Sequence, residues 1–385
     1  MNDELIYLDH AAATPMDPVV LTAMMPYFSE QFFNPSSPYA AGVQVKRDYR
    51  QAKARIARVL GVGADELVMT AGATESVNLA FQAAGQGRCV VAAIEHASVL
   101  AAAGRYTSPV IIQPTAKGRI TPEAVRAALT PEVIFVSIAL VNHELGYIQP
   151  IEEIARVVEA ERERRRLAGE TTPLIFHTDA SQAALLLDVK VKRLGVDLLT
   201  LSAAKVYGPK QVGLLWVRPG VHLSATVVGG GQEGGLRSGT ENVAGVIGFA
   251  TALELAAKRR GSEVKRLKHL RDRLAAMLTE ALPEMIISSD SKKSLVSFLN
   301  IAFPGVDAER LVFWLEARGV MVATGSACAA NAGTRSAVLA AIGLDAAAID
   351  GSLRLTLGRL NDEAQIERAA AMITEAVRLE QERRR

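Results

Sequence analysis

Lys205 occupies a position where a side chain could take part in chemistry. It follows an apolar run, Val196 to Leu201, that predicts a buried strand, and it precedes a Tyr-Gly-Pro sequence that must turn the backbone. A lysine at a strand end lies where open α/β sheets bind their ligands. Taken alone, such a lysine is more often a solvated loop residue, so its interpretation depends on the other stretches of the chain.

Cys328 is the second candidate. The stretch Val322 to Thr334, VATGSACAANAGT, is small, polar and glycine-containing and lies between a predicted strand and a predicted helix. Packing gives no reason for a cysteine there, and a thiolate in a partly exposed loop is reactive. Cys328 is therefore a candidate nucleophile, with a plain surface cysteine as the alternative. Cys89, in an apolar run, is interpreted as a buried small hydrophobe.

Polar residues also follow other predicted strands. Asp179 comes after PLIFHT, and Gln182 lies three residues later. A buried carboxylate there needs a cation or hydrogen bonds. His96 follows CVVAAIE, where a lone histidine is usually structural. Between the strand ELVMT and a helix that opens at Ala73 and Thr74, a turn of small residues leaves backbone N–H groups and a threonine hydroxyl to bind an anion.

Strands and helices alternate along the first half of the chain and must position these residues. Strands are predicted for CVVAAI, PVIIQ, EVIFVSIAL and PLIFHT, and helices for residues 43–60, 96–105, 121–129 and 151–167. This alternation is typical of βαβ units and of a parallel sheet covered on both faces. A further helix is expected from Pro18 to about Phe28.

The composition changes after residue 243. Residues 243–282 predict one or two long helices, and a strand at 294–303 and a helix at 306–320 are typical of a smaller α+β domain. The chain also exceeds the length at which one core usually stops growing. We therefore expect a large domain at residues 14–255. Residues 1–13 and 256–385 would form a small domain that carries the Cys328 loop.

The composition indicates a soluble globular protein, because 49% of the 385 residues are hydrophobic and 22% are charged. A net charge of +2 is too balanced to indicate nucleic acid or a membrane surface as the main partner, and 5% aromatic residues give little support to base stacking. We see no apolar run of membrane-spanning length, no targeting pattern at the N-terminus and too few cysteines for a disulfide framework. A cytoplasmic location is expected.

Seven motifs, in order along the chain, resemble those of the cysteine desulfurases. These are pyridoxal 5'-phosphate (PLP) enzymes of the aminotransferase class V group, here of the iron-sulfur-cluster type. The motifs are YLDHAAAT at residue 7, NPSS at 34, TAGATESVN at 70, HTDASQ at 177, GGGQEGGLRSGT at 229, GSAC at 325 and SLRLTLGR at 352. The resemblance implies an α/β protein of PLP-dependent transferase fold type I, with a mainly parallel sheet in the large domain and a smaller α+β domain.

The resemblance also implies roles around the cofactor. Lys205 would hold PLP as a Schiff base, and His96 would stack on the pyridoxal ring and relay protons. Asp179 would pair with the protonated pyridine nitrogen, which keeps the ring an electron sink, and Gln182 would lie beside the ring hydroxyl. The other expected cofactor contacts are Ala73, Thr74, His143, Ser202 and Thr240. Since Thr240 would reach the phosphate in the partner subunit, a homodimer with shared sites is implied.

The implied reaction converts L-cysteine to L-alanine. Arg354 would hold the substrate carboxylate with its planar guanidinium, and Asn34 and Asn142 would add substrate contacts. The Cys328 thiolate would take the substrate sulfur as a persulfide and deliver it for iron-sulfur cluster assembly, through an acceptor such as an iron-sulfur scaffold, or for thiolation. No catalytic metal is expected, with Cys328 as a possible transient iron-sulfur ligand. The alternatives are a selenocysteine or other C–S lyase and a degenerate desulfurase-like protein that only binds.

Several positions depart from the family pattern, among them His10, where an asparagine is expected, and Thr356, which replaces a serine. Ala204 replaces a histidine that touches the phosphate, His143 replaces the asparagine nearest the cofactor and substrate, and Gly234 replaces an arginine. We expect weaker retention of PLP rather than lost chemistry. His143 is expected either to reach the space beside Ala204 or to contact the substrate carboxylate, and to make activity sensitive to pH between about 6 and 7.

Overall fold

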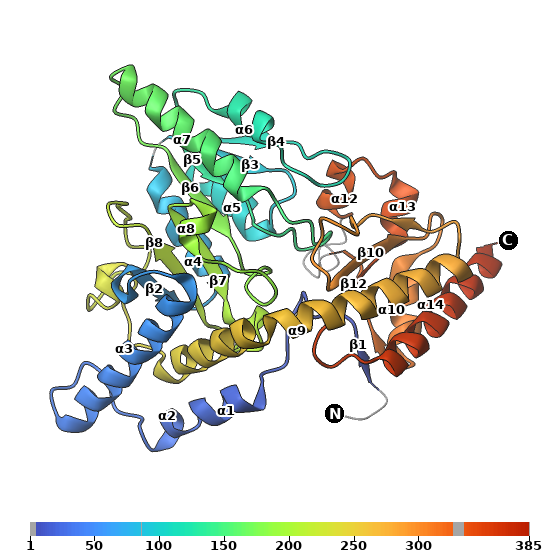
Figure 1. The fold of residues 1–385 in the computed structure, drawn as a ribbon, viewed down its shortest axis with the longest axis horizontal. Helices are drawn as coiled ribbons and strands as arrows, with labels where there is room; N and C mark the ends of the chain where they lie inside the picture. Colours follow the sequence, from blue (N-terminus) through green and yellow to red (C-terminus); the bar gives the residue numbers. More distant parts are fainter. Residues whose placement is uncertain (1–4, 86, 326–334, 385) are drawn as a thin grey trace.

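A seven-stranded sheet forms the centre of the larger part of the molecule (Figure 1). The computed structural model describes residues 5–85, 87–325 and 335–384. In spatial order the strands are β2 (Leu67–Thr70), β8 (Gly213–Val217), β7 (Leu198–Ser202), β6 (Ile175–Asp179), β5 (Val133–Ser137), β3 (Arg88–Ala92) and β4 (Pro109–Ile112). Strand β8 pairs antiparallel with β2 and β7, and the other pairs are parallel. The predicted mainly parallel sheet is confirmed.

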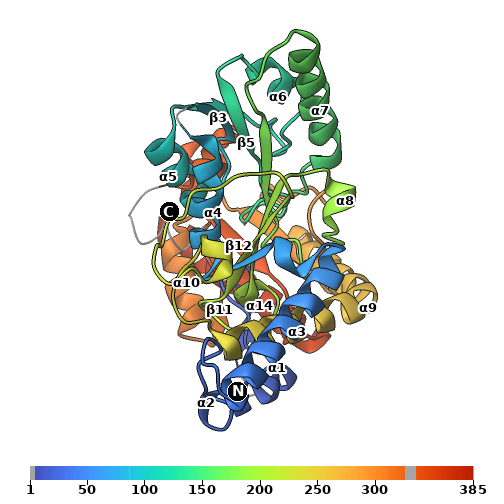
Figure 2. The ribbon, with the colours of Figure 1, turned by 90° about the vertical axis from the view of Figure 1, so that its left-hand side faces the viewer.

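Helices cover both faces of this sheet, so its strands are apolar on both sides. In β3, Cys89 and Val91 belong to the core beneath α4 (Ala73–Ala80) and α5 (Ala97–Tyr106), whereas Val90 and Ala92 belong to the main core on the opposite face. Figure 2 shows α4 and α5 on one side and α7 and α8 on the other. The helices that contribute to the main core include α3 (Ala40–Leu60), α6 (Pro122–Ala128), α7 (Ile151–Leu167) and α8 (Val191–Leu194).

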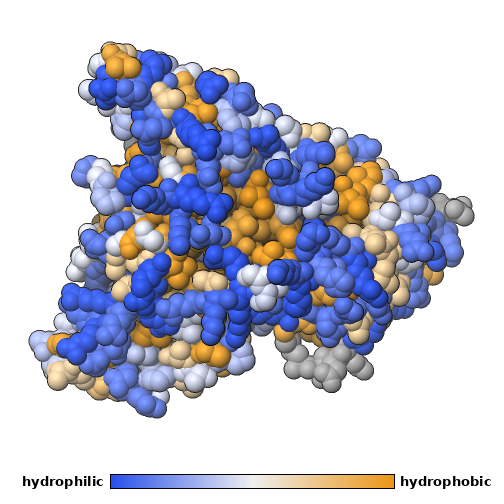
Figure 3. Space-filling view, viewed as in Figure 1, coloured by the Kyte–Doolittle hydropathy of each residue, from blue (hydrophilic) through white to orange (hydrophobic). Residues whose placement is uncertain are grey.

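Part of the run ERERRR of the sequence, residues 161–166, lies on the exposed side of α7. Arg164 and Arg166 pair with glutamates one turn earlier on the same helix and are 50% and 69% exposed. Figure 3 shows a mostly hydrophilic surface along this helix. Exposed pairs of this kind contribute little to stability, and we interpret this part of the run as a solvated face. Arg165, in contrast, is buried and donates to the carbonyl oxygens of Thr130 and Pro173, so the interpretation does not hold for the whole run.

The helix expected from Pro18 to about Phe28 is in fact two helices. The first, α1 (Pro18–Met24), begins where the Asp17 side chain accepts a hydrogen bond from the backbone N–H of Val19. The second, α2 (Pro26–Ser29), begins at a proline. Because proline lacks an N–H and its ring clashes with the preceding turn, it ends α1, and the prediction of one helix is wrong.

A single long helix, α9 (Val243–Ala281), connects the large sheet with a second group of strands (Figure 1). This group contains a three-stranded antiparallel sheet in the order β12 (Ser352–Thr356), β10 (Phe298–Ala302) and β9 (Ile286–Ile287). Its helices are α10 (Ala308–Glu316), α12 (Ala337–Ala341), α13 (Ala346–Asp350) and α14 (Glu363–Arg384). The expected boundary near residue 255 falls inside α9, and the domain limits stay a prediction.

The N-terminal segment joins the two groups of strands. Strand β1 (Ile6–Tyr7) pairs in parallel with β11 (Val320–Met321), and Asp9 bridges to Thr356 at the end of β12. The chain then reaches the large sheet, where Thr14 donates hydrogen bonds from its N–H and its hydroxyl to the carbonyl oxygen of Ala204. Short 3-10 turns complete the described elements at Ala64–Glu66, Phe81–Ala84, Ala203–Lys205 and Glu233–Gly235.

Candidate active site

A cavity of about 830 Å³ lies at the carboxyl edge of the parallel strands. Asp179 ends β6 and Ser202 ends β7, so both side chains reach the same edge of the sheet. Nine of the predicted site residues line this cavity: Ala73, Thr74, His96, His143, Asp179, Gln182, Ser202, Lys205 and Arg354. The fold therefore brings together residues that are far apart in the sequence.

Lys205 contacts the N-terminal segment. Its Nζ donates to the carbonyl oxygens of Ala11 at 2.7 Å and Ala12 at 2.5 Å. The side-chain amide of Gln182 donates to the same Ala11 oxygen at 3.0 Å. The small residues of this segment allow its backbone to approach both side chains, which gives the Ala-Ala-Ala run of the sequence a physical role.

His96 and Asp179 lie together in the cavity wall. The ring nitrogen Nδ1 of His96 accepts from the N–H of Ser98 at 3.1 Å and so caps α5, while Asp179 Oδ1 accepts from the N–H of Ser181 at 2.9 Å. Burial lowers the pKa of His96; Asp179 opposes this shift, whereas the charge of Lys205 adds to it. His96 is therefore neutral near pH 7, with its ring proton on Nε2.

His143 lines the cavity between His96 and Arg354. Its ring centroid is 5.2 Å from that of His96, and its carbonyl oxygen accepts from Arg354 Nη1 at 3.1 Å. Burial, followed by the charges of His96, Arg354 and Lys205, lowers the pKa of His143 well below its usual value. The expected pH sensitivity between about 6 and 7 is therefore wrong for this residue, because the ring is already neutral there.

Arg354 is held in a fixed position. Its Nη2 donates to Asp9 Oδ1 at 2.7 Å, and its side chain is only 4% exposed. Its Nε is buried without an acceptor among the described residues. A guanidinium held from two sides on a residue that lines the cavity suits a planar anionic group such as a carboxylate.

The opposite end of the cavity is suited to an anion of a different kind. Gly72 is the residue directly before helix α4. Its φ of 147° disfavours residues other than glycine. Because glycine has no side chain to accept a hydrogen bond, the first N–H groups of the helix remain uncapped. A Cβ added to Gly213 would lie 2.6 Å from the carbonyl carbon of Gly72, so the start of β8 lies against this turn. Thr74, Ser202 and Glu75 line the same end, and Arg237 Nε pairs with Glu75 at 2.9 Å.

These residues fit PLP. The cavity offers an amine at Lys205, a carboxylate at Asp179 for a ring nitrogen, and uncapped N–H groups with two hydroxyls for a phosphate. Asp179 ends β6, Lys205 follows β7, and the uncapped start of α4 follows β2. All three lie at the carboxyl ends of their strands, and β7 lies between β2 and β6 in the strand order. The charges and donors of the cavity thus match the parts of the cofactor.

Three of the predicted site residues that the structure describes do not line the cavity: Asn34, Asn142 and Thr240. The side-chain amide of Asn142 is buried and used internally: it donates to the carbonyl oxygen of Ile94 and accepts from two backbone N–H groups. Asn34 is exposed and accepts from the N–H of Ser36, and Thr240 is exposed near the Gly-rich stretch. Cys328 lies outside the described residues, so its role stays a prediction, as do the substrate roles of the two asparagines.

Several residues in or around the cavity were not identified from the sequence. Asp9 pairs with Arg354, and buried Glu95 accepts from the N–H of Ala139 at 3.0 Å. Glu144 accepts from the Ser336 hydroxyl at 2.6 Å, next to the segment that carries Cys328. Carboxylates at predicted strand ends could have indicated the first two. The third depends on a contact between residues 192 positions apart, which sequence pattern does not show.

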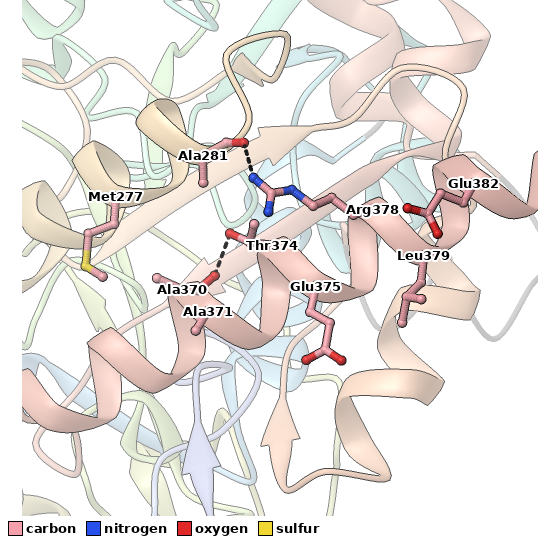
Figure 4. Close-up of a pocket in the computed structure, with 9 residues that line it drawn as sticks. All are labelled: Met277, Ala281, Ala370, Ala371, Thr374, Glu375, Arg378, Leu379 and Glu382. Carbon is pink, nitrogen blue, oxygen red and sulfur yellow. Dashed lines mark hydrogen bonds between the residues drawn. The ribbon is translucent and has the colours of Figure 1, made fainter.

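A second hollow, of about 540 Å³, lies between the end of α9 and α14 (Figure 4). Arg378 donates to the carbonyl oxygen of Ala281 at 3.3 Å, and Thr374 bonds to its own helix. It brings together none of the predicted site residues, so it is a weaker candidate than the large cavity. In the described ranges no group of three or more His, Cys, Asp or Glu could hold a metal, and none of the described helices is long and apolar enough to cross a membrane.

Comparisons with known proteins point the same way as this geometry. The aminotransferase class-V family matches residues 6–369. Cysteine desulfurase IscS 1 of Archaeoglobus fulgidus is 37% identical over 373 residues, which are 94% of each chain. A solved NifS-like protein superposes with a TM-score of 0.88 at 28% identity, covering 97% of this chain and all of the other. SspA in complex with cysteine superposes with a TM-score of 0.77 at 32% identity, covering 91% and 98%.

Proposed function

Because the chain belongs to the aminotransferase class-V family and to its cysteine desulfurases, we propose that it converts L-cysteine to L-alanine with PLP and transfers the sulfur to Cys328. The observation that carries this proposal is the single cavity shared by Lys205, Asp179, His96 and Arg354. A solved relative of 32% identity holds cysteine, which supports an amino-acid thiol as substrate.

PLP, when bound, supplies an electron sink for bond changes at the substrate carbon atoms. In our proposal Lys205 and Asp179 hold it, with the Thr74 and Ser202 hydroxyls and the start of α4 toward its phosphate. Gln182 is held by Ala11 beside the ring. The carbonyl groups of Ala11 and Ala12 orient the Lys205 amine toward the cavity, so the N-terminal segment fixes the reactive group.

Arg354 binds the substrate carboxylate in this proposal. Its contacts with Asp9 and the His143 carbonyl set the plane of the guanidinium before substrate arrives, so little side-chain entropy is lost on binding. Lys205 is the group that accepts and returns protons at the substrate Cα, with His96 as a proton relay. Because Nδ1 of His96 accepts from the N–H of Ser98, the neutral ring carries its proton on Nε2 and can donate it from there.

Sulfur transfer completes the reaction. The Cys328 thiolate attacks the substrate sulfur and forms an S–S bond, while the Cβ–S bond breaks and its electron pair remains with the carbon, which gains a proton to give alanine. The persulfide then passes sulfur to an acceptor protein, with an iron-sulfur scaffold as the leading candidate because the related chains are named IscS. We propose that this takes place in the reducing cytoplasm.

We also propose a homodimer. Large apolar side chains are exposed along α1, α2 and the start of α3: Val19, Leu21, Met25, Phe28, Phe32, Tyr39 and Val43. Exposed apolar patches of this kind mark interfaces. Thr240, exposed in this chain, would reach the phosphate site in the second copy.

Mass spectrometry of the purified, PLP-loaded protein after incubation with L-cysteine tests this function. We expect added sulfur on the peptide that contains Cys328, removable by a thiol reductant and absent from Cys328→Ser. Faster alanine release from selenocysteine than from cysteine would favour the lyase alternative. A protein that gains no yellow absorbance with PLP and no persulfide would be a binding protein only.

A further inference from the structure

We propose that Gln211 binds the cofactor phosphate through its side-chain amide and completes the wall that Ala204 leaves without a donor. This inference rests on the PLP cofactor of the proposed function. Both residues line the large cavity, together with Thr74, Ser202 and the turn at Gly72. Ala204 presents only a methyl group, whereas the glutamine amide carries two N–H donors that a phosphate oxygen can accept.

The strand register places Gln211 at the anion end. Ser202 at the end of β7 pairs with Gly213 at the start of β8, and the N–H of Ala203 donates to the carbonyl oxygen of Val212. The next residue of each segment beyond this pair is Ala204 on one side and Gln211 on the other. Gly213 packs against Gly72 at the start of α4. Gln211 therefore lies two residues before Gly213, the residue that contacts the start of α4. The uncapped N–H groups of α4 face the cavity at this point.

The backbone of Gln211 adds a second argument. Its φ of 58° lies in the left-handed region, which costs free energy for every residue except glycine. Strained residues of this kind gather at ligand sites because the surrounding contacts hold them in place. In this conformation the side chain of Gln211 lies on the cavity wall. Contact with the cofactor phosphate would explain why a glutamine occupies this strained position.

His143 does not serve this end of the cavity. It follows β5, whereas Ala204 follows β7, and β6 lies between these strands. Two strand spacings separate them by about 10 Å. The His143 ring packs on His96, and its carbonyl binds Arg354. Of the two expectations for this histidine, the structure therefore favours the substrate end over the space beside Ala204.

Titration of the cofactor-free protein with PLP and, separately, with pyridoxal tests the proposal. Binding is followed by absorbance and tryptophan fluorescence. Gln211→Ala should weaken PLP binding roughly tenfold, the effect of one hydrogen bond to a charged group, and should leave pyridoxal binding unchanged because pyridoxal has no phosphate. Gln44→Ala, at an exposed glutamine of α3, is the matched control and should change neither. An equal loss for both ligands, or no loss for PLP, would overturn the assignment.

Gln211→Gly separates binding from backbone strain. Glycine adopts the left-handed conformation without cost, so the cofactor-free variant should melt at a higher temperature than wild type and still bind PLP more weakly. Ala204→His in the Gln211→Ala background should restore PLP affinity by supplying a donor across the same wall. Unchanged affinity in Gln211→Gly, or no restoration in the double variant, would contradict the proposal. These readouts need no turnover, so they fail independently of desulfurase activity.

Discussion

At the scale of single residues, Arg354 is the group most strongly organised for one task. Its two Nη atoms are engaged by Asp9 and by the His143 carbonyl, and its Nε is buried without an acceptor among the described residues. Cross-strand pairing with Asn300 and bridging to Ala323 hold its backbone from both sides. The position of the guanidinium is thus set by contacts with four segments, which makes it sensitive to small changes.

Arg354→Lys should raise the KM for L-cysteine roughly tenfold to hundredfold, because an ammonium cannot reproduce the planar contacts to Asp9, His143 and a carboxylate together. The value of kcat should change much less. Steady-state kinetics over a range of cysteine concentrations measures this split. A fall in kcat with an unchanged KM would place Arg354 outside the substrate carboxylate site.

Glu95 predicts how stability depends on pH. Burial raises its pKa to about 8; a hydrogen bond from Ala139 opposes this rise, and the nearby Asp179 adds to it. Between about pH 4.5 and pH 8 the folded chain keeps a proton that the unfolded chain has lost, so the unfolding free energy falls as pH rises through this window. Each unit between the two pKa values corresponds to about 1.4 kcal/mol.

Glu95→Gln should remove this dependence, because the amide is uncharged and can still accept from Ala139. The melting temperature of the cofactor-free protein should fall more steeply between pH 5 and pH 8 for wild type than for the variant. The difference is expected because the folded wild-type carboxyl group has a pKa of about 8. Parallel curves for the two proteins would show that the carboxyl group is ionised in the folded state.

At the scale of elements, the strand ends were predictable and their neighbours were not. The apolar runs before Lys205 and Asp179 indicated both strands, and Gly61 ends α3 in the left-handed conformation that glycine favours. In contrast, the division of α1 from α2 required the local effect of Pro26, and the contact of Lys205 with Ala11 and Ala12 depends on tertiary packing.

The long helix α9 allows a matched pair of substitutions. Gly261 is exposed in the helix interior with nothing within 4 Å of an added Cβ, so Gly261→Ala should stabilise the protein by about 0.5–1 kcal/mol. Gly248 lies on the same helix, where an added Cβ would overlap Met24 and lie 3.2 Å from Pro209. Gly248→Ala should therefore destabilise by about 1–3 kcal/mol.

Thermal melts of the two glycine variants compare helix propensity with packing directly. We expect the melting temperature to rise for Gly261→Ala and to fall for Gly248→Ala. A fall for both would show that α9 is interrupted near residue 261, in conflict with one continuous helix from Val243 to Ala281.

At the scale of the whole molecule, the sequence predicted the fold class and most of the cavity because motif order carries that information. The missing parts are contacts between distant segments, such as Glu144 with Ser336, and the strained backbone of Gln211. The homodimer also belongs to this scale. Its proposed surface combines side chains from α1, α2 and α3 that are apolar and exposed in one chain.

Phe32→Glu should weaken the proposed dimer, because Phe32 is 65% exposed within the apolar set and a buried carboxylate at an interface is costly. Sedimentation should show a shift toward monomer, and the cofactor should be held less well if Thr240 completes the partner's site. Leu167→Glu, at a 73% exposed leucine at the end of α7, is the matched control and should stay as wild type. A monomeric wild-type protein would contradict the proposed shared sites.

Alanine formation from L-cysteine tests the central claim most directly. Purified protein loaded with PLP and given a thiol acceptor should release alanine with repeated turnover, and Lys205→Ala should lose nearly all of this activity because the amine that Ala11 and Ala12 orient is gone. Cys328→Ala should also be much slower, since no thiolate takes the sulfur. If wild type releases no alanine, or if Lys205→Ala and Cys328→Ala release it as fast as wild type, the cavity does not perform the proposed reaction.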